Sequence, residues 1–234
     1  LEDLKQAAHS PLAAILLELP MREIGGQLPS WDELCEQSKW AREQGIKLHM
    51  DGARLWQCPA AYDKPLAEIA DLFDSVYVSF YKDLGGISGA ILAGDKEFIE
   101  AARVWKARVG GNLYALYPYV LSARDGLRKN FSKLKGRQAF CQFLAAEFNQ
   151  YPQFQTLPHK PQANMFHLRV NGDSKTTMAA AIEWMNTHKV ALVTPPHKME
   201  DEYTVTEITI GQGYESKTRE QWQVLIADFA KRVL

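Results

Sequence analysis

Two ionisable residues stand at the ends of two apolar runs, where they could do chemistry together. The first run ends at Asp51, and the second run leads to Lys82 about 30 residues later, the length of one strand–helix–strand unit. Such a unit places parallel strands side by side, and ligands collect at the carboxyl ends of those strands. We therefore expect the Asp51 carboxylate and the Lys82 amine to face one pocket.

An amine and a carboxylate in one pocket suit pyridoxal phosphate chemistry. A lysine amine forms a Schiff base with the aldehyde of this cofactor, and a carboxylate keeps the ring nitrogen protonated. Arg54 lies on the first turn of a helix predicted over 53–61, and its guanidinium suits a bidentate contact with an amino-acid carboxylate. Each residue alone also has a structural explanation, because an Asp-Gly pair commonly forms a turn and a lone lysine is commonly solvated.

A wider set of residues supports this interpretation and resembles a known family. The set comprises Leu17-Glu18-Leu19, Gly25-Gly26, His49-x-Asp51-Gly52-Ala53-Arg54, Ser79-x-x-Lys82-x-Leu84-Gly85, Gly89 and Lys106-x-x-x-Gly110-Gly111. With these residues the chain resembles the threonine aldolase and β-eliminating lyase family of fold-type-I pyridoxal phosphate enzymes. The resemblance implies that Asp51 partners the pyridine nitrogen, Arg54 holds the substrate carboxylate and Lys82 carries the cofactor.

The resemblance adds Ser79, His49 and Lys106 to the expected cofactor-binding residues. His49 precedes Asp51 by two positions, so both side chains point to the same side of a strand. A packing role and a cofactor contact both remain open for His49. Lys106 lies late in a helix predicted over 96–108, where a basic residue complements the helix dipole. The resemblance alternatively brings Lys106 to the cofactor phosphate, in some members across a dimer interface.

The activity that the resemblance implies is a carbon–carbon lyase reaction of the aldolase type. A β-hydroxy amino acid would be cleaved to glycine and an aldehyde. Two alternatives stay open: a β-eliminating amino-acid lyase, and a catalytically inactive remnant that serves as a binding subunit. The base that takes the β-hydroxyl proton is not identified by the sequence.

Two departures from the family pattern bear on the substrate and the cofactor. Family members carry a further N-terminal part, which supplies the phosphate cup and the aromatic residue that stacks on the ring. The chain resembles the family without that part, so we expect it alone not to hold the cofactor tightly. Glu207 stands about where the family has an arginine for the substrate carboxylate. Arg22 and Arg169 are the candidates to replace that arginine.

Composition is typical of a soluble enzyme. The chain has 234 residues, of which 46% are hydrophobic and 24% charged, with a net charge of −1. This balance gives no reason to expect a nucleic acid or a membrane as partner. Three scattered cysteines, Cys35, Cys58 and Cys141, fit reduced thiols of a cytoplasmic protein and not a metal site. The resemblance implies a homodimer or homotetramer.

The predicted fold class is α/β, with a mostly parallel sheet flanked by helices and a small C-terminal α+β domain. Residues 1–130 form part of the large cofactor-binding domain, and residues 131–234 form the small domain with its connecting helix. The predicted strands are 13–19 (buried on both faces), 47–51, 74–80, 87–93 (antiparallel), 165–170, 190–193 and 203–210. The predicted helices are 31–44 (capped by Ser30), 53–61, 66–70, 96–108, 118–130, 132–150, 174–188 and 216–233, and a proline-rich linker covers 152–161.

Overall fold

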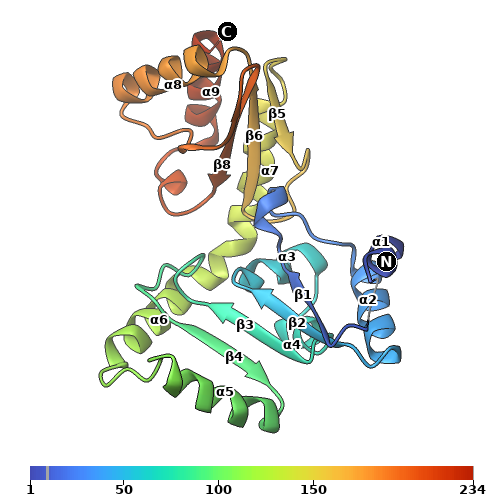
Figure 1. Ribbon diagram of the computed structural model, residues 1–234. Coiled ribbons are helices and arrows are strands. Elements are labelled where there is room, and N and C mark those ends of the chain that lie inside the picture. Colours follow the sequence, from blue (N-terminus) through green and yellow to red (C-terminus); the bar gives the residue numbers. More distant parts are fainter. Residues whose placement is uncertain (9–10, 234) are drawn as a thin grey trace. The chain divides into compact units, whose positions relative to one another are not determined.

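The protein divides into two compact units in the computed structural model, which describes residues 1–8 and 11–233 (Figure 1). The first unit comprises Leu1–Pro20 and Leu28–Leu134. The second comprises Lys135–Leu234 together with the short loop Met21–Gln27. No helix within the described residues is long and apolar enough to span a bilayer.

The first unit is built on a four-stranded sheet in the order β1 (Ala14–Glu18), β2 (Lys47–Gly52), β3 (Ser75–Ser79) and β4 (Ala90–Gly94). The first three strands are parallel, and β4 returns antiparallel to β3. The predicted α/β class with a mostly parallel sheet is therefore confirmed, as is the antiparallel return.

One face of this sheet is covered by helices. The helices include α2 (Trp31–Glu43), α3 (Cys58–Tyr62) and α4 (Leu66–Ala70). Their apolar side chains and those of the strands form one core, which includes Leu34, Leu48, Met50, Leu55, Cys58, Ile69, Phe73, Val76 and Val78. The predicted capping box of α2 is confirmed: Glu33 N–H donates to Ser30 Oγ over 3.2 Å, and Ser30 N–H donates to Glu33 Oε2 over 2.8 Å.

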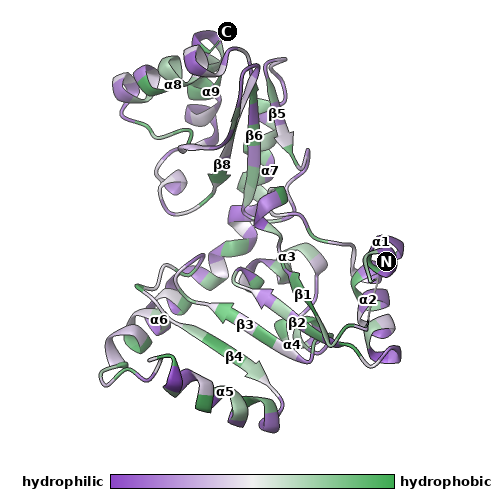
Figure 2. Cartoon of the chain, viewed as in Figure 1, coloured by the Kyte–Doolittle hydropathy of each residue, from purple (hydrophilic) through white to green (hydrophobic). Residues whose placement is uncertain are grey.

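The opposite face of the sheet is open within the described residues. Leu16 on β1 is 60% exposed, and every residue of β4 is exposed although the strand is apolar (Figure 2). The prediction that 13–19 is buried on both faces is thus wrong. A hollow of about 680 Å³ lies on this side, and His49, Leu92 and Phe98 are among its lining residues. Phe98 belongs to α5 (Lys96–Arg108), which has the predicted bounds and is capped by Asp95, whose Oδ1 accepts a hydrogen bond from Phe98 N–H over 2.8 Å.

The stretch after β2 departs from the predicted helix over 53–61. A 3₁₀ turn at Leu55–Gln57 comes first, and α3 begins only at Cys58. Pro59 lies in the first turn of α3, where a missing N–H costs nothing, so it starts this helix and does not disturb it. Arg54 therefore precedes the helical residues, as the N-cap of the 3₁₀ turn.

Helices also open and close the first unit. Helix α1 (Glu2–Ala7) opens it, and α6 (Tyr117–Asn130) begins one residue before the predicted 118. After a 3₁₀ turn at Phe131–Lys133, helix α7 (Leu134–Phe148) carries the chain into the second unit. The prediction of two successive long helices is confirmed.

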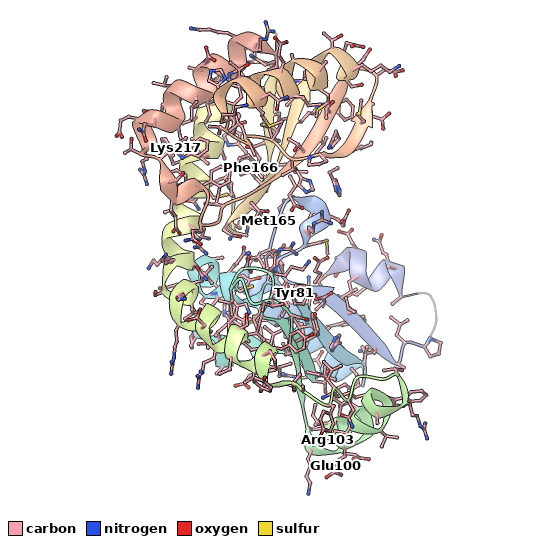
Figure 3. The ribbon with its side chains drawn as sticks, turned by 90° about the vertical axis from the view of Figure 1, so that its left-hand side faces the viewer. Tyr81, Glu100, Arg103, Met165, Phe166 and Lys217 are labelled. Carbon is pink, nitrogen blue, oxygen red and sulfur yellow. The ribbon has the colours of Figure 1, made fainter. Side chains whose placement is uncertain are left out.

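The second unit is an antiparallel four-stranded sheet packed against helices. The strand order is β5 (Phe154–Leu157), β6 (Met165–Asn171), β8 (Tyr203–Thr209) and β7 (Pro196–Glu200), and the helices are α7, α8 (Ser174–His188) and α9 (Arg219–Arg232). Met165 and Phe166 label the start of β6 in Figure 3. Phe148, Phe154, Phe166, Trp184 and Phe229 form the centre of its core. The α+β character of this part is confirmed.

Two strand predictions in the second unit are wrong. Strand β5 lies inside the segment that the prolines marked as a linker. The strand predicted over 190–193 is instead β7 at Pro196–Glu200. Leu192 and Val193 are apolar because they are buried in the core, and not because they pair in the sheet.

The Met21–Gln27 loop packs on the second unit although its neighbours in sequence belong to the first. Its ends are joined by Met21 N–H donating to Gln27 O over 3.0 Å. Gly25 has a φ of 76°, and a Cβ atom there would lie 1.9 Å from the carbonyl oxygen of Leu157. Only glycine allows so close a backbone approach. Met165 and His167 on β6 are 0% and 2% exposed, and the loop contributes to covering them.

Candidate active site

Asp51 and Lys82 lie at the same edge of the parallel sheet. Asp51 is the residue before the last in β2, and it is the register partner of Tyr77 on β3. Lys82 follows the end of β3 at Ser79 by three residues. Adjacent parallel strands end at the same edge, so the structure brings the two predicted residues to one end of the sheet.

Hydrogen bonds join the segment that follows β2 to the end of β3 and the segment beyond it. Ser79 Oγ donates to the carbonyl of Ala53 over 2.6 Å, and Trp56 Nε1–H donates to the carbonyl of Ser79 over 2.6 Å. Gln57 Nε2–H donates to Asp83 Oδ1 over 2.6 Å. These bonds hold the residues around Arg54 against the residues around Lys82. Sequence reasoning missed Gln57 and Asp83, whose pairing spans two loops and leaves no local signal.

The Asp51 carboxylate is half-buried and is fixed by its own turn. Its Oδ1 atom accepts a hydrogen bond from Ala53 N–H over 3.1 Å. Met50 and Gly52 on either side point into the core, so Asp51 faces the open side of the sheet together with His49. The described residues offer Oδ2 no hydrogen bond. That oxygen can accept a proton donor from a ligand.

Arg54 is a buried cation without a protein partner. Its residue exposure is 9%, and its guanidinium forms no hydrogen bond or ion pair with any other residue in the described part of the chain. A buried charge is costly unless it is paired, and functional sites are where such a cost is retained. The guanidinium is therefore the strongest sign that this edge of the sheet binds an anion.

The Lys82 side chain is exposed and lies beside an aromatic ring. Its Nζ atom is 5.1 Å from the centroid of the Tyr81 ring, within the range of cation–π attraction. Tyr81 in turn has its hydroxyl 3.0 Å from that of Tyr77. Sequence reasoning missed both tyrosines, although Tyr77 shares the two-residue period of Ser79 along the strand.

The remaining predicted cofactor residues have different surroundings. Ser79 is fully buried, and its hydroxyl serves the bond to Ala53. The His49 ring has Nδ1 2.8 Å from Ser75 Oγ and lines the hollow on the open face. Lys106 is exposed on α5, and within the described residues no hydrogen bond or ion pair links its side chain to residues 51–54 or 79–83. The roles of all three stay predictions.

The two arginines considered as replacements at Glu207 are both engaged in the second unit. Arg22 Nε is 2.7 Å from Glu207 Oε2. The Arg169 guanidinium stacks over the ring of Tyr203, 3.8 Å from its centroid, and its Nε–H donates to Asn171 over 2.8 Å. Glu207 thus has a compensating cation within its own unit.

Comparison with known proteins shows extensive similarity. The structure matches a proposed L-allo-threonine aldolase of Listeria monocytogenes with a TM-score of 0.94 and 37% identity, over 100% of this chain and 65% of that one. It matches a proposed aromatic amino acid beta-eliminating lyase/threonine aldolase of Exiguobacterium sp. 255-15 with a TM-score of 0.91 and 39% identity, over 99% of this chain and 65% of that one. An aldolase of Penicillium aethiopicum is 36% identical over 121 residues, which are 52% of this chain and 30% of the relative.

The match to a family model rests on the sequence independently of the fold. The model for beta-eliminating lyases covers residues 1–171, which include both segments at the candidate site and the whole of the first unit. The chain spans 65% of the length of each of the two solved proteins named above. With the shared fold, the parallel strand ends and the matched residues in agreement, this chain belongs to the beta-eliminating lyase family.

Proposed function

We propose that this chain provides the lysine, aspartate and arginine of a pyridoxal phosphate-dependent carbon–carbon lyase. The reaction would be the retro-aldol cleavage of a β-hydroxy amino acid to glycine and an aldehyde. The observation that carries the proposal is the buried, unpaired guanidinium of Arg54 at the strand ends that bear Asp51 and Lys82. The threonine aldolase names of the similar proteins support the choice of reaction.

The residues at this edge fit the proposed cofactor. Asp51 has one carboxylate oxygen held by its own turn and one without a partner among the described residues, so it can pair with a protonated ring nitrogen. Lys82 offers an accessible amine for covalent attachment to an aldehyde. When bound, the cofactor supplies an electron sink for the charge left on the substrate's α-carbon.

Arg54 has the role of positioning the substrate in this proposal. Its planar guanidinium forms two parallel hydrogen bonds with a carboxylate, which fixes orientation as well as location. Burial strengthens that contact, since water competes less in a low-dielectric site. The hydrogen bonds between residues 53–57 and 79–83, which we call the clasp, keep Arg54 and Lys82 in fixed positions relative to each other while substrate binds.

Covalent trapping tests the cofactor part of the proposal. We expect borohydride, added with pyridoxal phosphate, to fix the cofactor on Lys82, as mapped by peptide mass spectrometry. Trapping captures even weak binding, so it suits a chain that spans only part of its relatives. The matched control is Lys96→Arg, at an exposed lysine of α5, which should leave the labelling of Lys82 unchanged. Labelling that is spread evenly over the lysines would contradict the proposal.

Product analysis tests the reaction. Incubation with threonine or allo-threonine should release acetaldehyde and glycine, and Lys82→Ala should abolish the release. A β-eliminating lyase is the second candidate, favoured by the dual name of the Exiguobacterium protein; it would release ammonia and a keto acid instead. Labelling of Lys82 without either product would favour the inactive binding subunit.

We further propose that the protein forms a homo-oligomer. Large apolar side chains are exposed from α5 to the start of α6, namely Val104, Trp105, Val109, Leu113, Tyr114, Leu116, Tyr117, Val120 and Leu121. Exposed apolar surface of this extent is typical of an interaction site, and a second copy of the chain is the occupant we propose. Light scattering during size exclusion should give a multiple of 26.5 kDa, and Trp105→Glu should shift it toward 26.5 kDa.

We place the protein in a reducing compartment, the cytoplasm. Cys35, Cys58 and Cys141 are all free thiols, and burial raises the pKa values of the Cys58 and Cys141 thiols. Unpaired buried thiols are typical of proteins that are kept reduced. Fractionation of cells that express the protein would test this placement.

A further inference from the structure

Tyr81 lies directly against the proposed attachment residue. The centroid of its ring is 5.1 Å from Lys82 Nζ, and its side chain is 40% exposed (Tyr81 is labelled in Figure 3). The backbone on either side is anchored, since Phe80 N–H donates to Gly89 O over 3.0 Å and Gly86 N–H donates to Phe80 O over 2.8 Å. A large ring held at this place limits the positions that the Lys82 amine can occupy.

Tyr77 extends this arrangement toward Asp51. Its hydroxyl is 3.0 Å from the Tyr81 hydroxyl, and its Cα is the register partner of Asp51 across β2 and β3. Burial raises the pKa of Tyr77 to about 12, with further contributions from Tyr81 and from the charge of Asp51. Tyr77 therefore keeps its proton at neutral pH and can donate it in the hydrogen bond to Tyr81.

The two tyrosines thus link the residues at opposite ends of the candidate site. One ring stands next to Asp51, the other next to Lys82, and their hydroxyls meet between them. We infer that Tyr77 and Tyr81 are a positioning pair, which holds the Lys82 amine in place relative to the Asp51 strand end. This inference rests on the proposed function for the purpose of the pair, but the contacts that define it do not involve the cofactor.

The Tyr81 ring and the Tyr77 hydroxyl have different roles in this pair, so substitutions can test them separately. The Tyr81 ring face attracts the Lys82 ammonium, so Phe at this position should keep most of the effect, less the part that depends on the hydroxyl contact, and Leu should lose it. The Tyr77 hydroxyl fixes the orientation of the Tyr81 ring. In Tyr77→Phe the ring should therefore spend a smaller fraction of the time next to Lys82. Packing alone would separate Phe from Leu in stability, but it would not produce a ring-dependent signal at Lys82.

The experiment observes Lys82 by NMR after reductive dimethylation of the full chain with ¹³C-formaldehyde, which preserves the positive charge. The Lys82 methyl signal, assigned with Lys82→Arg, should show an upfield ring-current shift. We expect Tyr81→Leu to abolish this shift, whereas Tyr81→Phe and Tyr77→Phe, which both remove the contact between the two hydroxyls, should reduce it by similar and smaller amounts. The matched control is Tyr203→Leu, at a tyrosine of the second unit, which should leave the Lys82 signal unchanged. A Lys82 signal that is the same in Tyr81→Leu as in the unaltered protein would overturn the inference.

A second readout separates this inference from the proposed function. In borohydride trapping with pyridoxal phosphate, the share of label on Lys82 should fall about two- to fivefold in Tyr81→Leu, because an amine that the ring no longer confines reaches the cofactor less often, and it should fall less in Tyr81→Phe. If the unaltered chain shows the ring-current shift but no preferential label on Lys82, the proposed function fails and the positioning pair stands. If the label falls equally in Tyr81→Leu and Tyr81→Phe, the ring is not the positioning element.

Discussion

The Nε atom of Arg22 lies 2.7 Å from Oε2 of Glu207, so an ion pair joins the Met21–Gln27 loop to β8. The Glu207 side chain is 19% exposed, and the Arg22 side chain is 41% exposed. The contact is electrostatic, because the same oxygen has no well-aligned hydrogen bond within the described residues. The negative charge of Glu207, which stands where the family pattern has an arginine, is thus balanced inside the second unit.

Breaking this ion pair should loosen the second unit. We expect Arg22→Met to lower its stability by about 1–2 kcal/mol, since it leaves the half-buried Glu207 carboxylate without its nearest cation. Amide exchange at β6 and β8, followed by mass spectrometry, would measure the change. Arg232→Met removes a more exposed pair with Glu183 and should cost less than about 0.5 kcal/mol. Equal effects of the two substitutions would contradict the importance of the Arg22 contact.

The second unit should also lose stability in mild acid because of His167. Burial lowers the pKa of His167, and so does His197, whose ring centroid is 4.8 Å away. Arg22 acts in the same direction, whereas Glu207 and Glu23 oppose it. The unfolded chain therefore takes up the proton first, and the stabilising contribution, present above about pH 6.5, is lost as the pH falls below it.

Urea unfolding at several pH values, followed by amide exchange in β6, would measure this dependence. We expect His167→Gln to make the stability of the second unit less dependent on pH between about 5 and 7. His159→Gln alters an exposed histidine of the same unit and should leave the dependence intact. A dependence that survives His167→Gln unchanged would assign it to other groups.

Replacing Gly25 should be far more damaging than replacing another glycine with the same backbone conformation. Gly25→Ala puts a Cβ atom 1.9 Å from Leu157 O, and we expect a loss of about 3 kcal/mol or more. Gly45 has a φ of 68° but nothing within 4 Å of an added Cβ. Gly45→Ala should cost about 1 kcal/mol, the expense of the left-handed conformation alone. Thermal unfolding of both variants compares them directly, and similar losses would show that the loop packs elsewhere.

Removing the Ser79 hydroxyl should open the clasp at the candidate site. Ser79→Ala leaves the Ala53 carbonyl without the 2.6 Å hydrogen bond and should destabilise the first unit by about 1–3 kcal/mol. Amide exchange should rise in residues 53–57 and 79–83 and stay constant in α5. Ser132→Ala, at an exposed serine, should have an effect below about 0.5 kcal/mol. Unchanged exchange in both segments would show that the remaining two bonds suffice.

The unpaired guanidinium of Arg54 should lower the stability of the protein, although it serves to bind the substrate. Arg54→Met replaces an unpaired buried charge with an apolar chain of similar length, so we expect the melting temperature to rise, by the equivalent of about 1–2 kcal/mol. Threonine cleavage should be lost in the same variant. Arg124→Met, at an exposed position of α6, should change neither property. A lower melting temperature for Arg54→Met would mean that the guanidinium stabilises the fold through contacts with water.

Local signals in the sequence predicted the elements that depend on local physics. The capping box at Ser30 and the bounds of α5 and α8 need only side chains within one helical turn. The open face at Leu16 was not predictable, because an apolar run does not reveal which of its faces the rest of the chain covers. The same limit applies to Leu192 and Val193, which are buried in the core but unpaired in the sheet.

In the candidate site, too, some features could be predicted from local sequence signals and others depend on the rest of the fold. Asp51 and Lys82 could be placed from strand periodicity and crossover length, which fix where strand ends fall. The burial of Arg54 could not, because it depends on a 3₁₀ turn where a continuous helix was expected. The Tyr77–Tyr81 contact depends on the rotamers of two side chains four residues apart, one within β3 and one beyond its end, which no sequence pattern specifies.

The assignment of Met21–Gln27 to the second unit means that neither unit is one uninterrupted piece of polypeptide. A single proteolytic cut near Leu134 would leave the loop joined by peptide bonds only to the first unit, so that noncovalent contacts alone would hold it to the rest of the second unit. A gene fragment starting at Lys135 would lack the seven residues that help to shield Met165 and His167, and its product should be prone to aggregation through that bared strand.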